Sequence, residues 1–157
     1  MSDVVRGKDF KFYRNTDDPY DNSPTWALVT NVRDLTRNLE KDLADASVRG
    51  SSFRLQVATM KNFSIDFQMV YDPTDLDVIA FEEAYHADTD VELLDLDGPI
   101  GTAGSKGLRF MGQVSNFTVN EALADVGLVD VTIVPGYTPD NLPRRVEVVT
   151  PGTVTDA

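Results

Sequence analysis

Alternation of apolar and polar residues with a period of two is the dominant pattern along this chain. In the stretch "NFSIDFQMVYD", apolar side chains occupy every second position and polar ones lie between them: Phe63, Ile65, Phe67 and Met69 against Ser64, Asp66 and Gln68. Because successive side chains of a β-strand point to opposite faces, this stretch predicts a half-buried strand. Similar runs, "TWALVTNV", "SFRLQVAT", "VELLDLD" and "VGLVDVTIV", predict further strands. Domains built from such runs are typically β-sandwiches or barrels.

The run "GLRFMGQVSNFTV" changes phase along its length. Leu108 and Phe110 share one parity, whereas Phe117 and Val119 share the other. A strand whose apolar face switches sides needs a bulge or a bend, and Gly112 lies between the two halves. We therefore predict that a sheet turns a corner near Gly112.

One helical segment, "DPTDLDVIAFEEAYHAD" at residues 72–88, interrupts the β pattern. Asp72 or Thr74 can act as its N-cap, Pro73 suits a first turn, and acids near the N-terminus complement the helix dipole. We expect this helix to lie across a sheet face or edge. Its apolar stripe is predicted to comprise Leu76, Ile79, Ala80, Ala84 and Ala87, widened by Phe81 and Tyr85.

The segment 33–50, "RDLTRNLEKDLADASVRG", fits two structures. Leu35, Leu39 and Leu43 recur every four residues, which by itself predicts a thin helical stripe. The alternating charges around them favour instead a long extended or mobile loop between strands, longer than compact domains carry without a purpose. From the sequence, both interpretations stay open.

Glycine recurs at every third position in residues 97–107, "DGPIGTAGSKG". A P-loop needs a lysine after its last glycine, but here Lys106 precedes Gly107 and a strand-like run follows. A dinucleotide-binding motif needs a helix at that point. The segment therefore predicts a mobile hairpin tip that joins two strands.

Length and charge narrow the choice of function. The chain has 157 residues, enough for one domain, and its 26 acids against 14 bases give a formal net charge of −12. No Lys or Arg occurs between residues 62 and 105, where many of the acids lie. This disfavours tight nucleic-acid binding, which depends on basic residues that displace counterions from phosphates. The acidic block can also be a solvated face that keeps the protein soluble.

Disulfides, membrane spans and targeting segments are not expected either. The sequence contains no cysteine and no long apolar run, and its first residues, "MSDVVRGKDF", lack the apolar centre of a signal peptide. We therefore expect a soluble domain that does not associate with membranes.

Groups that could support catalysis or metal binding are few. His86 is the only histidine, and Glu82 lies one helical turn before it, a spacing typical of surface electrostatics. One histidine without cysteine does not make a zinc site. A single tryptophan offers few platforms for a sugar substrate. Four acids could attract calcium but lack the order of an EF-hand loop: Asp88, Asp90, Asp95 and Asp97. We expect no enzyme activity, no metal and no cofactor.

The order of these elements resembles that of the major tail tube proteins of long-tailed, siphovirus-type bacteriophages. The resemblance covers roughly residues 8–136. It rests on "GKDFKFYRN", "PTWALVTNVRDLTRNLEKDLADASVRGSSFR", "NFSIDFQMVYDPTD", the helix "LDVIAFEEAYHAD", "VELLDLDG" and "GLRFMGQVSNFTVNEALADVGLVDVTIVPG".

The resemblance implies a single tail tube domain over residues 1–157. Its fold would be mainly β, with two packed antiparallel sheets in a sandwich-like or barrel-like arrangement and one flanking α-helix at 72–88. An N-terminal arm (1–20), a long inter-ring loop (33–50) and a C-terminal arm (137–157) would complete it. In that family six protomers form a ring whose inner sheets close into a barrel, and the loop reaches the next ring. The corresponding contact residues here would be Asp34, Leu35, Arg37, Leu39, Lys41, Leu43 and Arg49.

The family also implies a location and partners. Rings stack into the tail tube of the virion, assembled in the host cytoplasm, and DNA passes through the tube only as cargo when it leaves the capsid. The implied partners are further copies of the chain, a tape measure protein inside the tube, the tail terminator and the distal tail and tail tip proteins. Because a lining Lys or Arg would hold phosphates, the lumen should be acidic or neutral, and Asp66 is the candidate lumen-facing acid.

Two alternatives remain from the sequence. The inner tube of a contractile tail or of a contractile secretion system shares the expected fold. A monomeric β-sandwich module that binds carbohydrate or calcium belongs to a different functional class.

Overall fold

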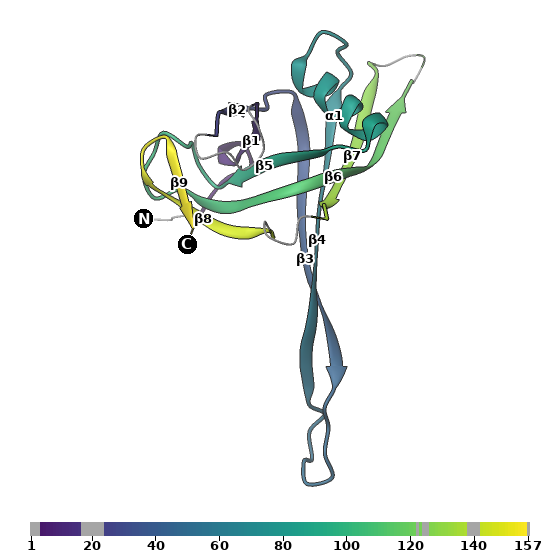
Figure 1. Cartoon of the computed structure of the whole chain (residues 1–157), viewed down its shortest axis with the longest axis vertical. Coiled ribbons are helices and arrows are strands. Elements are labelled where there is room, and N and C mark those ends of the chain that lie inside the picture. Colours follow the sequence, from purple (N-terminus) through teal and green to yellow (C-terminus); the bar gives the residue numbers. More distant parts are fainter. Residues whose placement is uncertain (1–3, 17–23, 122, 124–125, 138–141, 157) are drawn as a thin grey trace.

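The computed structural model describes residues 4–16, 24–121, 123, 126–137 and 142–156 and shows an antiparallel β structure with one α-helix (Figure 1). Nine strands form one hydrogen-bonded sheet with the order β2-β1-β5-β6-β7-β4-β3, and β8 and β9 extend from β6. The prediction of a mainly β fold with one helix is confirmed. The sheet is continuous and curls into an open half-barrel.

The elements follow the chain in a simple order, beginning with a 3-10 helix. They are η1 (Gly7–Asp9), β1 (Lys11–Asn15), β2 (Trp26–Leu28), β3 (Val32–Asp45), β4 (Gln56–Val70), α1 (Leu76–Ala87), β5 (Asp90–Leu96), β6 (Lys106–Asn120), β7 (Leu128–Pro135), β8 (Arg144–Thr150) and β9 (Thr153–Asp156).

The second half of β4 has the alternating burial that its sequence predicts. Phe63, Ile65, Phe67 and Met69 are buried, and the residues between them are only half-buried. They form the main core together with apolar residues of β7, α1, β5 and β6. The first half of β4 is exposed, and Phe53, just before it, is 79% exposed. Of the run "SFRLQVAT", predicted as a strand, only the part from Gln56 onward belongs to one, in the half of β4 that leaves the body.

Helix α1 is shorter than the predicted 72–88 and buries a different stripe. Its N-cap is Asp75, whose side chain accepts a hydrogen bond from the Asp77 backbone N–H. Asp72 instead accepts from the Thr74 backbone N–H at 2.9 Å, which makes the turn before the helix. The buried residues are Val78, Phe81 and Ala84, whereas Leu76 is 74% exposed. The prediction was right for Phe81 and Ala84 but wrong for Leu76 and Ala87, which are exposed. The bulky Val78 and Phe81 determine which side of the helix meets the sheet.

The phase change in β6 is real but lies further along than Gly112. The register of β6 against β7 shifts between Val114 and Asn116. Gly112 has another role, since a Cβ at this position would lie 2.4 Å from Cγ2 of Ile133. The strand therefore needs glycine at 112 for close packing and makes its bulge two residues later.

A buried polar group joins β1, β2, β5 and β6. Glu92, 1% exposed, accepts hydrogen bonds from the Arg109 Nε and from the Asn15 Nδ2, the latter at 3.3 Å. The Arg109 guanidinium also lies over the Trp26 ring, 5.3 Å from its centroid. A buried carboxylate needs such partners, because desolvation without them is costly.

The segments expected as terminal arms contain strands of the sheet. Within 1–20, β1 pairs with β5 and buries Phe12 and Tyr13. Within 137–157, β8 pairs with β6 and β9, and Val146 and Val148 are buried in a second apolar cluster. The alternating run around 144–150 is too short to predict this burial. The burial results from pairing of β8 with the first residues of β6, Lys106 to Arg109.

Residues 97–105 connect β5 to β6 as a hairpin tip, and the tip is held by its own chain. The Ser105 Oγ donates to the Pro99 carbonyl at 2.9 Å, and the Gly104 N–H donates to the Val148 carbonyl at 2.8 Å. Gly104 has φ of +99°, which favours glycine. A Cβ on Gly107 would lie 1.7 Å from the Asp95 carbonyl oxygen. The glycines thus serve turn geometry and close strand approach.

The segment 33–50, whose structure the sequence left open, is extended. Residues 32–45 form β3, which pairs antiparallel with β4 along its length. The two strands continue away from the body as a long hairpin (Figure 1).

Candidate functional site

Short polar side chains line one face of the strands β3, β4, β7 and β6. The strand register places Thr36, Asp66, Thr132 and Asn116 in one row across the four strands. We call this surface the polar face; it comprises Thr36, Asn38, Ser64, Asp66, Gln68, Asn116, Thr118, Asn120, Asp130 and Thr132. The opposite face of the same strands carries the apolar core.

The two acids of the polar face are held by neutral hydrogen-bond donors. Asp66 accepts from the Asn38 Nδ2 at 2.9 Å and from the Thr132 Oγ1 at 2.6 Å. Asp130 accepts from the Gln68 Nε2 at 3.1 Å and from the Asn120 Nδ2 at 2.8 Å. Hydrogen bonds of this kind stabilise an ionised carboxylate without neutralising its charge. The face is therefore negative and polar, and none of its positions carries Lys or Arg.

The four-stranded part of the sheet has two unpaired edges. β3 pairs only with β4 in the described part of the chain. β6 pairs with β5 only as far as Gln113, so beyond this residue its second edge has no partner among the described strands. An unpaired strand edge presents free N–H and C=O groups and is a template for pairing with another chain.

The β3–β4 hairpin projects from the body as an arm. The pairing of β4 with β7 ends at Ile65, and residues 38–64 beyond it form a two-stranded hairpin with its turn (Figure 1). At about 3.3 Å per residue the arm reaches roughly 40 Å, more than the diameter of a small domain. A two-stranded hairpin is only marginally stable by itself in water. This arm exposes large apolar side chains along its length: Leu39, Leu43, Val57 and Met60.

Five of the seven residues predicted for inter-ring contact occupy alternate positions of β3, and three of these five lie within the arm. Successive odd positions of a strand share a face, so β3 places five of them side by side: Leu35, Arg37, Leu39, Lys41 and Leu43. Of the remaining two, Asp34 lines a groove at the base of the arm and Arg49 lies in the turn at its tip. Asp66 lies on the polar face, as described above.

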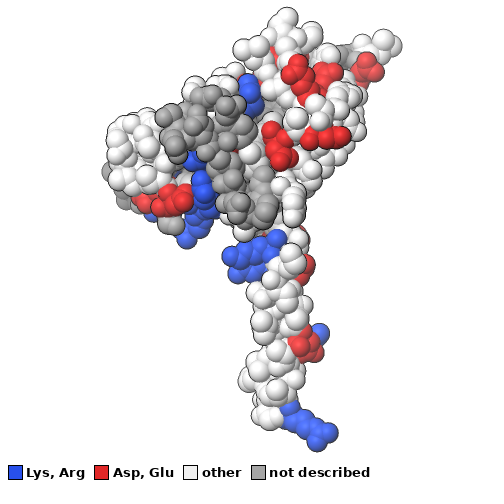
Figure 2. Space-filling model, in the orientation of Figure 1, with Lys and Arg blue, Asp and Glu red and all other residues white. Residues whose placement is uncertain are grey.

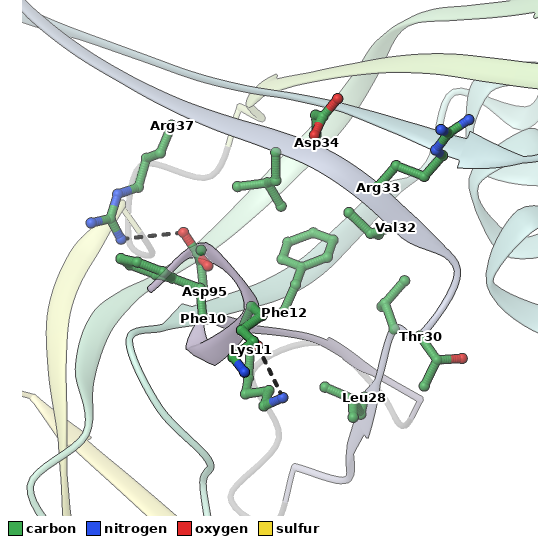
Figure 3. A pocket seen from close by; sticks show the side chains of 14 residues that line it. Phe10, Lys11, Phe12, Leu28, Thr30, Val32, Arg33, Asp34, Arg37 and Asp95 are labelled. Atoms are coloured by element: carbon green, nitrogen blue, oxygen red, sulfur yellow. Dashed lines mark hydrogen bonds and ion pairs between the residues drawn. The ribbon is translucent and has the colours of Figure 1, made fainter. Parts of the chain in front are cut away.

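A groove of about 880 Å³ lies where the arm leaves the body (Figure 3). It is lined by apolar residues from β1, β2, β3 and the segments beside them, and by the ion pair between Arg37 and Asp95, whose Nη1 and Oδ2 are 3.3 Å apart. The Asp95 side chain is only 4% exposed. Burial raises the pKa of Asp95 to about 6, against the lowering effect of Arg37, and the Asp97 charge raises it further. The apolar lining residues include Phe10, Phe12, Leu28, Val32 and Leu35.

The groups considered for catalysis and calcium binding are not assembled into a site. His86 is exposed on α1, where its ring contacts Tyr85, and Asp95 is buried beside Arg37. Within the described residues, no three His, Cys, Asp or Glu side chains lie close enough to hold a metal ion. Among the same residues, no helix is long and apolar enough to cross a membrane.

Sequence reasoning missed two features of this site. One is the polar face as a whole, although "SNFTVN" and "NFSIDFQ" carry its alternating short polar residues. The other is the position of Lys41 directly opposite Lys61 on the arm. Both depend on the register between strands, which the sequence does not show directly. The alternating polar residues are therefore the only indication of the polar face along the chain, and nothing along it indicates the lysine pair.

Comparison with known proteins rests on structure alone. No protein-family model matches the sequence, and no curated protein is detectably similar to it. The fold is similar to that of a chain in the SPP1 tail tube, solved by solid-state NMR and cryo-EM, with a TM-score of 0.69 and 11% identity over 89% of this chain and 78% of that one.

Two further structures extend this similarity. A chain from the tail of an empty gene transfer agent particle, refined with C6 symmetry, has a TM-score of 0.67 and 11% identity, with 98% and 99% of the two chains covered. A chain of the six-fold symmetrised baseplate of the anti-feeding prophage has a TM-score of 0.60 and 11% identity over 94% and 99%. The likeness to tail tube proteins inferred from the sequence is thus confirmed for the fold: this chain has the fold of the tail tubes of phage and phage-like particles.

Proposed function

We propose that this chain is a structural subunit of a tail tube, whose copies close into rings that stack into a hollow tube. The main support for the proposal is the arrangement of edges and faces in the four-stranded part of the sheet, which consists of β3, β4, β7 and β6. It has two edges that no described strand pairs with, a polar face without Lys or Arg and an apolar opposite face. A closed ring of such sheets would satisfy both edges and enclose the polar face.

Ring closure would join β3 of one copy to the outer edge of β6 in the next. Pairing of this kind removes the exposed edges, which is how barrels avoid aggregation. The six-fold symmetry of the gene transfer agent tail and of the prophage baseplate supports a hexameric ring here. Six copies of β3, β4, β7 and β6 would then form one continuous barrel.

The polar face would line the lumen of that barrel. Its acids, Asp66 and Asp130, are held by neutral donors, and its other side chains are hydroxyls and amides. Each Lys or Arg that neutralises a phosphate strengthens DNA binding, so a wall without them lets DNA pass. This supports genome ejection with DNA as passing cargo.

The hairpin arm would connect rings. It projects from the body along the long axis, and the apolar residues along it are exposed in the single chain. We assign the inter-ring contact to Asp34, Leu35, Arg37, Leu39, Lys41, Leu43 and Arg49. A tube of this type also implies a virion location, assembly in the host cytoplasm, a tape measure protein inside the tube, and terminator and tail tip proteins at its ends. The role is structural and not enzymatic.

The likeness to the anti-feeding prophage chain favours a second candidate, the inner tube of a contractile apparatus. The surface that meets a sheath would be the outer one, opposite the polar face. A monomeric calcium-binding or carbohydrate-binding module receives less support, because the solved structures that share this fold come from tail tubes and related particles.

Electron microscopy and sedimentation of the purified chain test the proposal. We expect hollow tubes or rings with six-fold symmetry at high protein concentration or after addition of preformed tail tips. A species of 17.3 kDa under every condition would contradict the proposal, and calcium-dependent stabilisation of that monomer would favour the binding module.

A further inference from the structure

The arm carries a pair of like charges that the single chain leaves unexplained. Lys41 and Lys61 are direct cross-strand partners, and both are exposed. Like charges directly opposite each other destabilise a strand pair. Neither lysine forms an ion pair with a described residue, although Arg37 nearby pairs with Asp95. A carboxylate from outside the chain would relieve this repulsion.

The lysine pair lies on the side of the arm that faces away from the lumen. Lys41 shares its face with Leu39, whose cross-strand partner is the buried Phe63, whereas Asn38 and Ser64 point to the polar face. DNA in the lumen would therefore not meet these lysines. Leu39, 62% exposed, lies beside Lys41 on this face, and Leu43, 55% exposed, follows two residues later, beyond a shift in the strand register. The surface thus combines two positive charges with an apolar border.

Helix α1 presents a surface with the complementary composition. Its outward side carries Leu76, Ala80, Glu83 and Ala87, which are spaced as one stripe opposite the buried Val78 and Phe81. Leu76 is 74% exposed, and Glu83, about two helical turns further along the same side, is also exposed. A second apolar stripe on a surface helix has no partner in the single chain, and here it is bordered by acids.

The two surfaces lie at opposite ends of the long axis. In Figure 1 the arm points away from the end that holds α1. Figure 2 shows acidic side chains gathered over the α1 end, while Lys and Arg lie at the base and the tip of the arm. A head-to-tail contact joins two different patches of the same chain, and repetition of it along one axis builds an open stack.

We propose that the arm of one copy binds the outward side of α1 in a second copy, with Lys41 and Lys61 receiving Glu83 and Leu39 and Leu43 covering Leu76. The inference rests on the proposed stacking of rings and names the surface that receives the arm. The ion pairs fix the register of the contact, because an apolar strip alone could slide. Stacking then has a single polarity, because the arm and α1 lie at opposite ends of the long axis.

Charge reversal tests the contact in the full chain. We expect Lys41→Glu with Lys61→Glu to lower the fraction of protein in sedimenting tubes at least tenfold, and Glu83→Lys to do the same. Combining the three changes should restore tubes, because the charges are exchanged. The matched control is Lys106→Glu with Arg145→Glu, two exposed bases on β6 and β8 away from the arm. Circular dichroism checks that each variant is folded.

The outcomes separate this contact from the proposed function. If the native chain forms tubes and the Lys41→Glu, Lys61→Glu variant forms them equally well, the contact is refuted while the tube remains. If reversal leaves tubes intact but abolishes binding of labelled duplex DNA, the lysines bind nucleic acid and the contact is again refuted. Failure of the triple variant to recover, with both partial variants folded, would also refute the pairing with Glu83. If the native chain forms no tubes, the proposed function itself fails.

Discussion

Arg37 and Asp95 join the base of the arm to the body through an ion pair of 3.3 Å, in which the carboxylate is almost completely buried and the guanidinium is 30% exposed. The pair connects β3 with β5, which are not neighbours in the sheet. It is therefore a tertiary link that fixes the direction in which the arm leaves the body.

The first prediction concerns the pH dependence of this link. Burial raises the pKa of Asp95 from 3.8 to about 6, so the folded chain binds this proton more tightly than the unfolded chain. The contribution of Asp95 to stability is thus greatest below about pH 4 and is lost as the pH rises through 6. At neutral pH the ionised carboxyl costs up to about 3 kcal/mol, from about 1.4 kcal/mol per pKa unit.

Replacing Asp95 by Asn should remove this dependence. We expect the Asp95→Asn variant to match the native chain near pH 4 and to have a higher free energy of unfolding near pH 7.5, with water solvating Arg37. Urea denaturation of the two proteins at both pH values measures the difference. An equal difference at both pH values would contradict the raised pKa.

The second prediction concerns the polar face. We expect Thr118→Lys to leave tubes intact and to make them retain short duplex DNA at low salt, because each ring gains lysines in the lumen. Thr118 is exposed and is a better site than Asp66, where Lys would also remove the acceptor for Asn38 and Thr132. Co-sedimentation with labelled DNA measures retention. Thr150→Lys on β8 is the control, and equal retention by both variants would place Thr118 outside the lumen.

The third prediction concerns the side of α1 that meets the sheet. Phe81 is fully buried and packs against Phe67, with ring centroids 5.3 Å apart. Phe81→Ala should lower the free energy of unfolding by about 3–5 kcal/mol, as is typical of buried aromatic residues. Leu76→Ala, on the exposed side, should change it by less than about 0.5 kcal/mol. Chemical denaturation of the two variants would decide the matter, and similar losses would mean that the helix packs on its other stripe.

The fourth prediction is that the arm is needed for stacking and not for folding. Residues 41–61 can be replaced by Asn-Gly, because Glu40 and Asn62 are cross-strand partners and a two-residue turn can join them. We expect the shortened chain to keep its thermal stability, since the main core lies outside the arm. It should form rings at most. Tubes of normal length in electron micrographs would rule out the assignment of the arm to inter-ring contact.

The fifth prediction is that the arm becomes protected only on assembly. In the free subunit the distal hairpin has no third strand and few buried side chains, so its backbone hydrogen bonds should open easily. Hydrogen exchange of peptides from 39–60 should be fast in the monomer and slow in tubes. Strong protection already present in the monomer would show that the hairpin is stable without a neighbouring ring.

The sequence by itself determined the β class, the position of the helix and the core face of β4. Phe63, Ile65, Phe67 and Met69 could be assigned because alternation is a local property, and the period of two differs clearly from 3.6. The glycines of 97–107 likewise indicated a turn locally. The acid-rich composition could also be read directly, with 26 acids against 14 bases.

Tertiary structure decided the rest, because the local patterns allowed more than one answer. Leu35, Leu39 and Leu43 are spaced by four, which is near a helical turn and is also a multiple of two, so a helix and a strand place all three on one face. Pairing with β4 favours the strand. In the same way, α1 offers apolar residues on two sides, and only the fit of Phe81 between β-strands determines which side is buried. The Lys41–Lys61 pair exists only in a register between strands, since cross-strand contacts join residues that the sequence keeps apart.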